Sequence, residues 1–311
     1  MKKILMVRHV QRPAAIAATE VAVRELTQLG IEVIGEDEAD KLTNDHGPDL
    51  VLAMGGDGTI LAAAESARRF NIPLLGINAG HMGFLAEASP ESIPTLMHRL
   101  ALGEYHEEKR STLDISIKLP GENLITDWAL NDAVVKHTDP AHPVHLVLVV
   151  DGQDVSTYGA DGMILATPTG STAYSFSAGG PVVWPDTEAV VISPIAAHGL
   201  FTRPLVVGPG STIEVVINEE HWSAPEVWCD GLRRTIAPAG TSVVARVSQN
   251  PVRLVRMEHT PFAERLVTKF NLPVVFSIGV IYNEVGTVIS FVCFIHLFHS
   301  NRSFLVHLIF W

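Results

Sequence analysis

The hydrophobic pattern of the chain changes its period near residue 106, and this change constrains the fold more than any other feature. Before it, short apolar runs typical of buried strands alternate with longer stretches of helical character. Strands that alternate with helices form βαβ units, so we predict an α/β domain with a mostly parallel sheet over residues 1–106. The expected strands are Lys3–Val7, Ile31–Ile34, Leu50–Met54 and Leu74–Ile77, and the expected helices are Ala14–Leu29, Thr59–Phe70 and Glu91–Leu100.

Beyond this point apolar and polar residues alternate, as in strands with one face exposed to water. In Leu113–Leu119 every second residue is apolar, which is the period of a half-buried strand. We therefore predict a β-rich, sandwich-like second domain over residues 107–272, whose end returns to the first domain. Further expected strands are Val144–Val150, Met163–Ala166, Val190–Ser193, Thr212–Ile217 and Val243–Val247.

Residues 273–311 form a hydrophobic tail that differs from the rest of the chain. Val274–Phe298 contains Glu284 as its single charged residue, and its length and apolarity fit a membrane span. Asn283, Glu284 and Gly286 interrupt the stretch, however, and no other feature indicates a membrane protein. Three interpretations stay open: a native part of the protein without a membrane role, a membrane contact through the tail, and a segment foreign to the ancestral domain, such as the product of a reading-frame change.

The charge balance limits the ligands that the chain can bind. Its 22 Lys and Arg residues are outnumbered by 34 Asp and Glu residues, for a formal net charge of −12, which argues against binding to nucleic acid. Any phosphates must be held by backbone amides, metal ions and a few side chains. The 14 histidines and the distant Cys229 and Cys293 lack metal-ligand spacing, so no protein-bound structural metal is expected. No signal peptide is visible, so we expect reduced cysteines and a cytoplasmic location.

The strongest local motif is Gly55-Gly56-Asp57-Gly58-Thr59, between a predicted strand and a predicted helix. Glycines allow a close backbone approach, and the first helical amides form an anion site. Asp57 can accept a proton from a hydroxyl or hold a bridging metal ion. Asp-Gly is also a common turn dipeptide, and at its three other occurrences a plain turn is the better interpretation. The motif is neither a P-loop nor a Rossmann fingerprint.

Three other segments have polar residues where a ligand could bind. Residues 78–85 follow a predicted strand, at the sheet edge where open α/β sheets bind ligands, although a tight turn explains them equally well. Residues 161–181 run from a strand into a loop rich in hydroxyls and glycines. That loop is either a polar surface loop or a site for a sugar and a base, with Tyr174 offering a stacking face. The Asn131-Asp132 pair can hold ribose hydroxyls, but such a pair is more often a turn.

Taken together, these motifs resemble the NAD kinase family in their order and spacing over roughly residues 1–272. The resemblance is carried by GGDGT at 55–59, NAGHMGFL at 78–85, Asn131-Asp132, and DGMILATPTGSTAYSFSAGGP at 161–181. The GGDG element is shared with diacylglycerol and sphingosine lipid kinases and, more loosely, with phosphofructokinases. The TPTGSTAYSFSAGGP stretch is much more specific to NAD kinases.

The resemblance implies a transfer of phosphate from ATP to the adenosine ribose of NAD, with a divalent cation, usually magnesium, and a dimeric or tetrameric assembly. Asp57 matches the family's proton acceptor. The residues that match phosphate or ATP contacts are Gly55, Gly56, Gly58 and Thr59. The residues that match NAD contacts are Asp57, Gly58, Asn131, Asp132, His142, Asp161, Thr172, Ala173, Tyr174, Ser175, Phe176 and Ser177.

The chain departs from the family pattern at a few positions. Gly159-Ala160 stands where many members carry a basic residue, Ala62 stands where many have Arg, and Asp132 replaces a more common Glu. Each lost charge-assisted phosphate contact would weaken binding by about 1 kcal/mol or more. Two alternatives therefore stay open: a lipid kinase of the same superfamily, and a non-catalytic NAD(P)-binding sensor.

Overall fold

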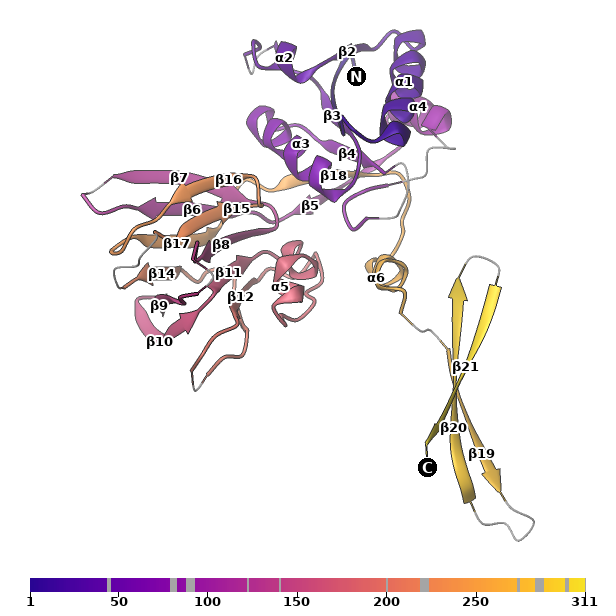
Figure 1. Ribbon diagram of the computed structural model, residues 1–311. Helices are drawn as coiled ribbons and strands as arrows, with labels where there is room; N and C mark the ends of the chain where they lie inside the picture. The colour runs from indigo at the N-terminus through magenta and orange to yellow at the C-terminus, as the bar shows by residue number, and fades with distance from the viewer. Residues whose placement is uncertain are drawn as a thin grey trace. The chain divides into compact units, whose positions relative to one another are not determined.

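The computed structural model describes residues 1–43, 46–78, 83–87, 93–121, 123–139, 141–199, 201–218, 224–272, 275–282, 288–299 and 302–310. The chain divides into two compact units. One consists of Met1–His81 and Leu85–Glu258, and the other of Met82–Phe84 and His259–Trp311. The first unit contains three six-stranded sheets, A, B and C, and the second contains one three-stranded sheet, D (Figure 1).

Sheet A is mostly parallel, with strand order β2-β1-β3-β4-β18-β5. Its strands are β1 (Lys3–Arg8), β2 (Glu32–Ile34), β3 (Leu50–Met54), β4 (Leu74–Ile77), β5 (His106–Arg110) and β18 (Val252–Arg256). The helices beside it are α1 (Pro13–Gln28), α2 (Glu36–Ala39), α3 (Asp57–Phe70) and α4 (Ile93–Leu102). One buried cluster packs α3 on one face of the sheet, and another packs α1 and α4 on the other face. Both faces are covered, which explains the apolar run of β3.

Sheets B and C are antiparallel and pack face to face. Sheet B has the order β10-β9-β14-β17-β6-β7, and sheet C has the order β13-β12-β11-β8-β15-β16. Sheet B consists of β6 (Leu113–Lys118), β7 (Leu124–Ala129), β9 (Val144–Val150), β10 (Gln153–Ala160), β14 (Ile213–Ile217) and β17 (Ser242–Val247). Sheet C consists of β8 (Asp132–Lys136), β11 (Gly162–Ala166), β12 (Val190–Ile195), β13 (Leu205–Val207), β15 (Glu226–Cys229) and β16 (Arg233–Ile236).

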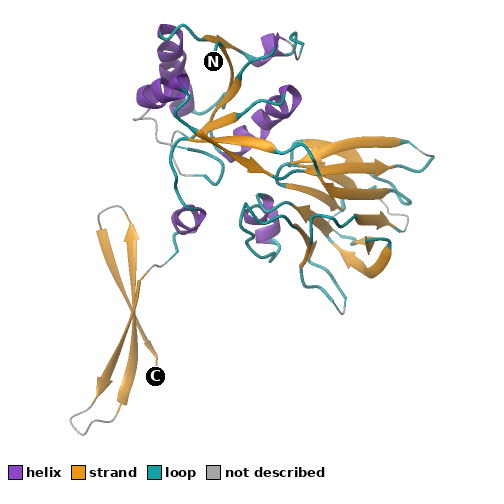
Figure 2. Cartoon of the chain, turned by 180° about the vertical axis from the view of Figure 1, so that it is seen from behind, coloured by secondary structure: helices purple, strands orange, loops and turns teal. Residues whose placement is uncertain are grey.

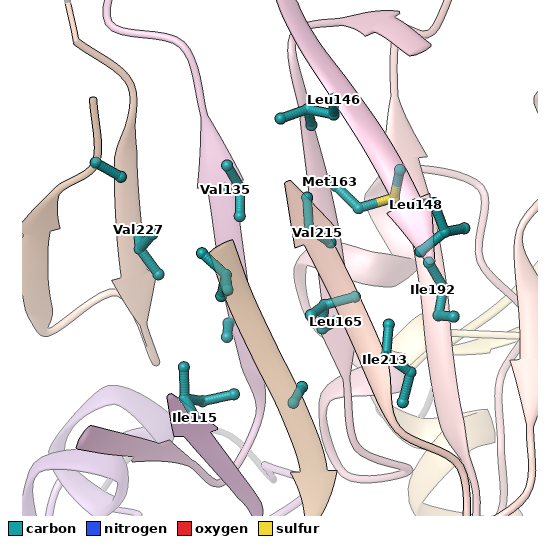
Figure 3. Packing of buried hydrophobic residues seen from close by; sticks show 14 of the residues in the cluster. Ile115, Val135, Leu146, Leu148, Met163, Leu165, Ile192, Ile213, Val215 and Val227 are labelled. Carbon is teal, nitrogen blue, oxygen red and sulfur yellow. The ribbon is translucent and has the colours of Figure 1, made fainter. Parts of the chain in front are cut away.

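The core of this sandwich follows from the alternation in the sequence. Ile115 and Val215 of sheet B face Val135 and Leu165 of sheet C in one buried cluster (Figure 3). The polar residues between them point away, as the period of two requires. The predicted fold class, an α/β domain with a mostly parallel sheet followed by a β-rich sandwich, is therefore confirmed.

The end of the β-rich region contributes a strand to the first sheet. β18 follows the last strand of sheet B, and its Leu254 lies opposite Leu74 of β4 in parallel. β5, whose sequence HEEKR contains no apolar residue, pairs with it at the edge of sheet A. The predicted domain boundaries near residues 106 and 272 stay predictions.

The second unit contains the helix α6 (Phe262–Phe270) and the antiparallel sheet D (Figure 2). The ring of Phe84 packs in tilted geometry against those of Phe262 and Phe270, at 5.7 Å between ring centroids in both pairs. The strands of sheet D are β19 (Val275–Tyr282), β20 (Val288–His299) and β21 (Arg302–Phe310). Among the described residues, no helix combines the length and the apolarity that crossing a membrane demands.

Candidate functional site

The Gly55–Thr59 motif, here called the glycine turn, connects the carboxyl end of β3 to the first turn of α3. A Cβ on Gly55 would lie well inside van der Waals contact with the side chain of Thr59, so the turn requires glycine at this position. Gly56 is the extended N-cap residue, and Asp57 is the first residue of the helix. The backbone amide of Leu85 donates to Oδ1 of Asp57 at 3.4 Å. The turn thus places a carboxylate beside helical amides whose dipoles attract anions.

Part of the NAGHMGFL motif lies beside the glycine turn. Gly55 donates its amide to the carbonyl of Ile77 at 2.9 Å, and Glu87 donates its amide to Gly76 at 2.6 Å. The segment 85–87 therefore returns along the end of β4, where Glu87 forms a bridge with Ile77. Residues 79–82 lie outside the described residues.

The Asn131-Asp132 pair is held by a carboxylate that lies far away in the sequence. Asp230 accepts hydrogen bonds from the amides of Leu130 at 2.9 Å, Asn131 at 2.6 Å and Asp132 at 3.3 Å. Its carboxylate also accepts from Nη2 of Arg233 at 3.3 Å. Because these bonds fix three consecutive peptide groups, they set the direction in which the side chains at 131 and 132 point.

The TPTGST segment closes against the same pair of residues. Thr167 donates its hydroxyl to the carbonyl of Leu130 at 2.6 Å and its amide to that of Asn131 at 2.9 Å. A Cβ on Gly170 would overlap the backbone carbonyl of Asn131, so only glycine fits there. The short helices Gly170–Thr172 and α5 (Tyr174–Ser177) follow directly.

These segments surround a pocket of about 370 Å³ on sheet C, here called the sheet C pocket. Its lining residues are Asn131, Asp132, Val134, Lys136, Ala173, Tyr174, Trp228, Asp230 and Gly231. It therefore brings together two stretches of predicted NAD contacts, at 131–132 and at 173–174. The side chain of Tyr174 is 44% exposed and so has a face available for stacking.

The pocket has acidic groups in an apolar setting. Burial, together with the charge of Asp230, raises the pKa of Asp132 to about 7. Burial also raises the pKa of Asp230 to about 6, although its three amide hydrogen bonds act in the opposite direction. Lys136 is the cationic residue of the lining, and its Nζ lies 5.0 Å from the ring centroid of Trp228. Both carboxyls therefore titrate near neutral pH, as groups in binding sites often do.

The other predicted site residues do not line this pocket. Asp57, Gly58 and Thr59 belong to the glycine turn. Asp161 precedes β11, at the end opposite the TPTGST segment, and lies 3.6 Å from His137. His142 is exposed and pairs with Asp139 at 2.7 Å. Within α5 the side chain of Ser175 is buried and bonds to Ser193 at 2.9 Å, whereas Phe176 is 43% exposed.

Sequence reasoning missed several of the lining residues. Lys136 could have been found, because it alternates with Asp132 and Val134 on one face of a strand. Trp228 and Asp230 carry no such signal. Asp230-Gly231 reads as an ordinary turn, which it is, since Asp230 has a φ of 54°. Its second role depends on contacts with residues about one hundred positions earlier in the chain.

Two solved structures share this architecture. The crystal structure of yeast NADH kinase complexed with NADH matches with a TM-score of 0.79 at 23% identity, covering 89% of each chain. The crystal structure of an NAD kinase from Archaeoglobus fulgidus in complex with ATP matches with a TM-score of 0.63 at 29% identity, covering 82% of this chain and 94% of that one. The fold is therefore that of NAD and NADH kinases.

The sequence comparisons define the family. Residues 38–105 match the ATP-NAD kinase N-terminal domain, and residues 130–257 match the ATP-NAD kinase C-terminal domain. NAD kinase 2 of Streptomyces avermitilis is 41% identical over 288 residues, which cover 88% of this chain and 95% of that protein. The NAD kinase of Leifsonia xyli is 42% identical over 288 residues, covering 87% and 95%. The chain belongs to the NAD kinase family, a family of phosphotransferase enzymes, as its motifs predict.

Proposed function

We propose that this protein transfers the terminal phosphoryl group of ATP to the 2′-hydroxyl of the adenosine ribose of NAD and so forms NADP. The observation that carries the proposal is the sheet C pocket. In a chain of the NAD kinase family, one cavity is lined by both Asn131-Asp132 and Ala173-Tyr174. A polar pair that can hold ribose hydroxyls and an aromatic face that can stack on a base suit the adenosine half of NAD.

Several of the predicted residues then have a chemical role. The amide of Asn131 and the carboxyl of Asp132 bind ribose hydroxyls, and Tyr174 stacks on the adenine. The glycine turn and the first amides of α3 bind the phosphates of ATP. The 2′-oxygen attacks the γ-phosphorus, the bond from that phosphorus to the β,γ-bridging oxygen breaks, and ADP leaves. Asp57 takes the proton of the hydroxyl, and positioning supplies most of the rate.

We propose that a divalent cation, magnesium, binds mainly through the phosphates of ATP and not through a cluster of protein side chains. Across the described parts of the chain, no three His, Cys, Asp or Glu side chains gather closely enough to hold a metal ion. Magnesium commonly binds through substrate phosphates with one or two carboxylates. Asp57 is the carboxylate at the glycine turn and is the residue that would contact such an ion, which would neutralise charge on the phosphates.

The test is the formation of NADP from NAD, ATP and magnesium by the purified chain. Asp57→Asn keeps the shape of the side chain but cannot accept the proton, so its kcat should fall by about 10² to 10⁴-fold. Thermal unfolding checks that this variant is folded. Near-normal turnover by folded Asp57→Asn would remove the assigned role, and a wild-type chain that binds NAD but forms no NADP would favour the sensor alternative.

The remaining proposals concern the setting of the enzyme. Family membership favours NAD over the lipid substrates of the alternative kinase, and lipid phosphorylation in a parallel assay would reverse that choice. We propose a homo-oligomer, dimeric or tetrameric, as the family resemblance suggests, and a cytoplasmic location. Comparing residues 1–272 with the full chain in a vesicle flotation assay tests a membrane contact through the tail.

A further inference from the structure

A line of four charged side chains lies on the face of sheet A that α3 covers; three of them are buried, and the side chain of Glu108 is 33% exposed. β5 and β18 pair so that Glu108 lies opposite Leu254, and Arg256 opposite His106. Paired residues of antiparallel strands point to the same face, and Leu254 packs in the cluster under α3. The residues of this line, here called the buried ion network, are Glu87, Arg256, Glu108 and Arg110.

The four residues, two carboxylates and two guanidiniums, form a continuous chain of contacts. Nη1 of Arg256 donates to Glu87 at 2.7 Å, and its Nε donates to Glu108 at 2.6 Å. The other oxygen of Glu108 lies 2.9 Å from Nη2 of Arg110. Burial acts to raise the pKa of Glu108, but the charges of Arg110 and Arg256 lower it below its usual value. Glu108 therefore stays ionised between two cations.

One end of the network reaches the residue that faces the proposed proton acceptor. Arg256 donates from Nη1 to the carbonyl of Leu85 at 3.1 Å. The amide of the same residue, Leu85, donates to Asp57 at 3.4 Å. Leu85 thus lies between the guanidinium of Arg256 and the carboxylate of Asp57, and its backbone is hydrogen-bonded to both.

The other end reaches the segment that lines the sheet C pocket. Nη1 of Arg110, a residue with only 2% of its surface exposed, donates to the hydroxyl of Thr169 at 3.3 Å. The carbonyl of Thr169 in turn accepts from the hydroxyl of Thr172 at 3.2 Å. Thr169 lies four residues before Ala173, the first member of this segment in the pocket lining.

Stability alone gives little reason for such a network. Replacing buried ion pairs by apolar residues of similar volume is often neutral or stabilising, whereas a buried charge that loses its partner is costly. A network of this kind does, however, define one geometry, because each guanidinium offers donors in a rigid fork. Transfer reactions depend on such geometry, and a displacement of about 1 Å can cost about 10²-fold in rate.

We propose that Arg256 is a positioning residue for the phosphoryl transfer. Its guanidinium connects the backbone that faces Asp57 to the ion network that ends at Thr169, so that the proton acceptor and the nucleotide-binding segment keep one relative placement. This inference rests on the proposed function, in which Asp57 accepts the proton of the ribose hydroxyl.

The same two strands offer a matched control on the opposite face of the sheet. Arg253 of β18 pairs with Glu107 of β5 at 3.2 Å, so it is also an arginine that bridges to a glutamate of the neighbouring strand. Its side chain is 30% exposed, however, against 3% for that of Arg256. Arg253→Lys should keep both kcat and KM within twofold of the wild type.

The experiment compares Arg256→Lys, Thr169→Val, Thr169→Ser and Arg253→Lys with the wild type in steady-state NADP formation. Lysine cannot reproduce the fork of three contacts, so Arg256→Lys should lower kcat by about tenfold to a hundredfold. Thr169→Val should lower kcat about tenfold with the KM for ATP unchanged, and Thr169→Ser, which restores the hydroxyl, should recover it. The double variant Arg256→Lys with Thr169→Val should lose less than the product of the single losses.

Several results would overturn the proposal. Folded Thr169→Val and Arg256→Lys with kcat within twofold of the wild type would show that the network only stabilises the fold. Losses of kcat that multiply would show that Arg256 and Thr169 do not act through one network. If Arg256→Lys does not fold, the contrast between Thr169→Val and Thr169→Ser decides. A wild-type chain that forms no NADP overturns the proposed function and this inference with it, whereas an active wild type with unaffected variants overturns the inference alone.

Discussion

The glycine turn and the sheet C pocket are built in opposite ways. The turn consists of five consecutive residues, and the group that obstructs a side chain on Gly55 is Thr59 of the same motif. The pocket is assembled from separate stretches near residues 131, 173 and 230, and the group that obstructs a side chain on Gly170 is the backbone of Asn131. The phosphate-binding element is thus a local structure, whereas the proposed dinucleotide site exists only in the folded sandwich.

We expect the largest effect from Gly170→Ala, which disrupts the sheet C pocket and leaves the glycine turn intact. In Gly170→Ala the new methyl group overlaps a backbone carbonyl that cannot rotate away, so we expect a loss of about 3 kcal/mol in the free energy of unfolding. The KM for NAD should rise with it. Chemical denaturation and steady-state kinetics measure both. Gly208→Ala, where nothing lies within 4 Å of the new Cβ, is the control and should stay within about 0.5 kcal/mol.

The variant Gly55→Ala, in contrast, disturbs the glycine turn and leaves the sheet C pocket intact. Here the obstacle is Thr59, whose Oγ1 can rotate away but whose Cβ, 2.7 Å from the new methyl group, is fixed to the backbone of α3, so the first turn of the helix must shift at a cost of about 2 kcal/mol. We expect a smaller loss of stability than for Gly170→Ala and a rise in the KM for ATP with little change in that for NAD. If both variants raised the two KM values equally, the division into a local and an assembled site would be wrong.

Asp230→Asn tests how strongly the pocket depends on its central carboxylate. One oxygen becomes an NH₂ group that faces the backbone donors at 130–132, so unfolding should become easier by about 1 to 3 kcal/mol. The KM for NAD should rise because Asn131 and Asp132 lose their support. Asp151→Asn is a matched control, since Asp151 also sits at positive φ in an Asp-Gly turn but is exposed. An equal effect of both variants would contradict the assigned role.

The pH dependence of stability should reveal the same carboxyls. The folded-state pKa values of Asp132, about 7, and Asp230, about 6, exceed the unfolded value near 4. Between about pH 4 and 7 the folded state therefore binds more protons, and the free energy of unfolding falls as the pH rises, by at most about 1.4 kcal/mol per pH unit for each group. Asp132→Asn should flatten this slope in urea titrations, and an unchanged slope would exclude Asp132 as its source.

The smallest expected effect concerns His142, which lies outside the pocket lining. Its side chain is 57% exposed and pairs with Asp139, so His142→Ala should change stability by less than about 0.5 kcal/mol. If His142 contacts NAD, as the family resemblance implies, the KM for NAD should rise a few-fold while kcat stays the same. An unchanged KM would remove His142 from the set of NAD contacts.

The predictions from sequence succeeded where a pattern is local. The apolar run at 50–54 and the alternation at 113–118 match β3 and β6, because burial on both faces or on one face leaves a direct periodic signal. The strand β5 was missed, since a sequence of charged residues has no such signal and its buried groups are paired ions. For the same reason Arg256 and Glu108 could not be identified as partners.

The sequence by itself therefore determined the alternation of strands and helices over the first hundred residues, the glycine turn, and the motifs that indicate the family. Each of these depends on neighbours within a few residues, where backbone geometry and burial act directly. Only the tertiary structure decided that Asp230 supports the Asn131-Asp132 pair and that Arg256 stands between Leu85 and Glu108. These contacts join residues that lie roughly one hundred or more positions apart in the chain, and their partners are selected by distance and charge in the folded state.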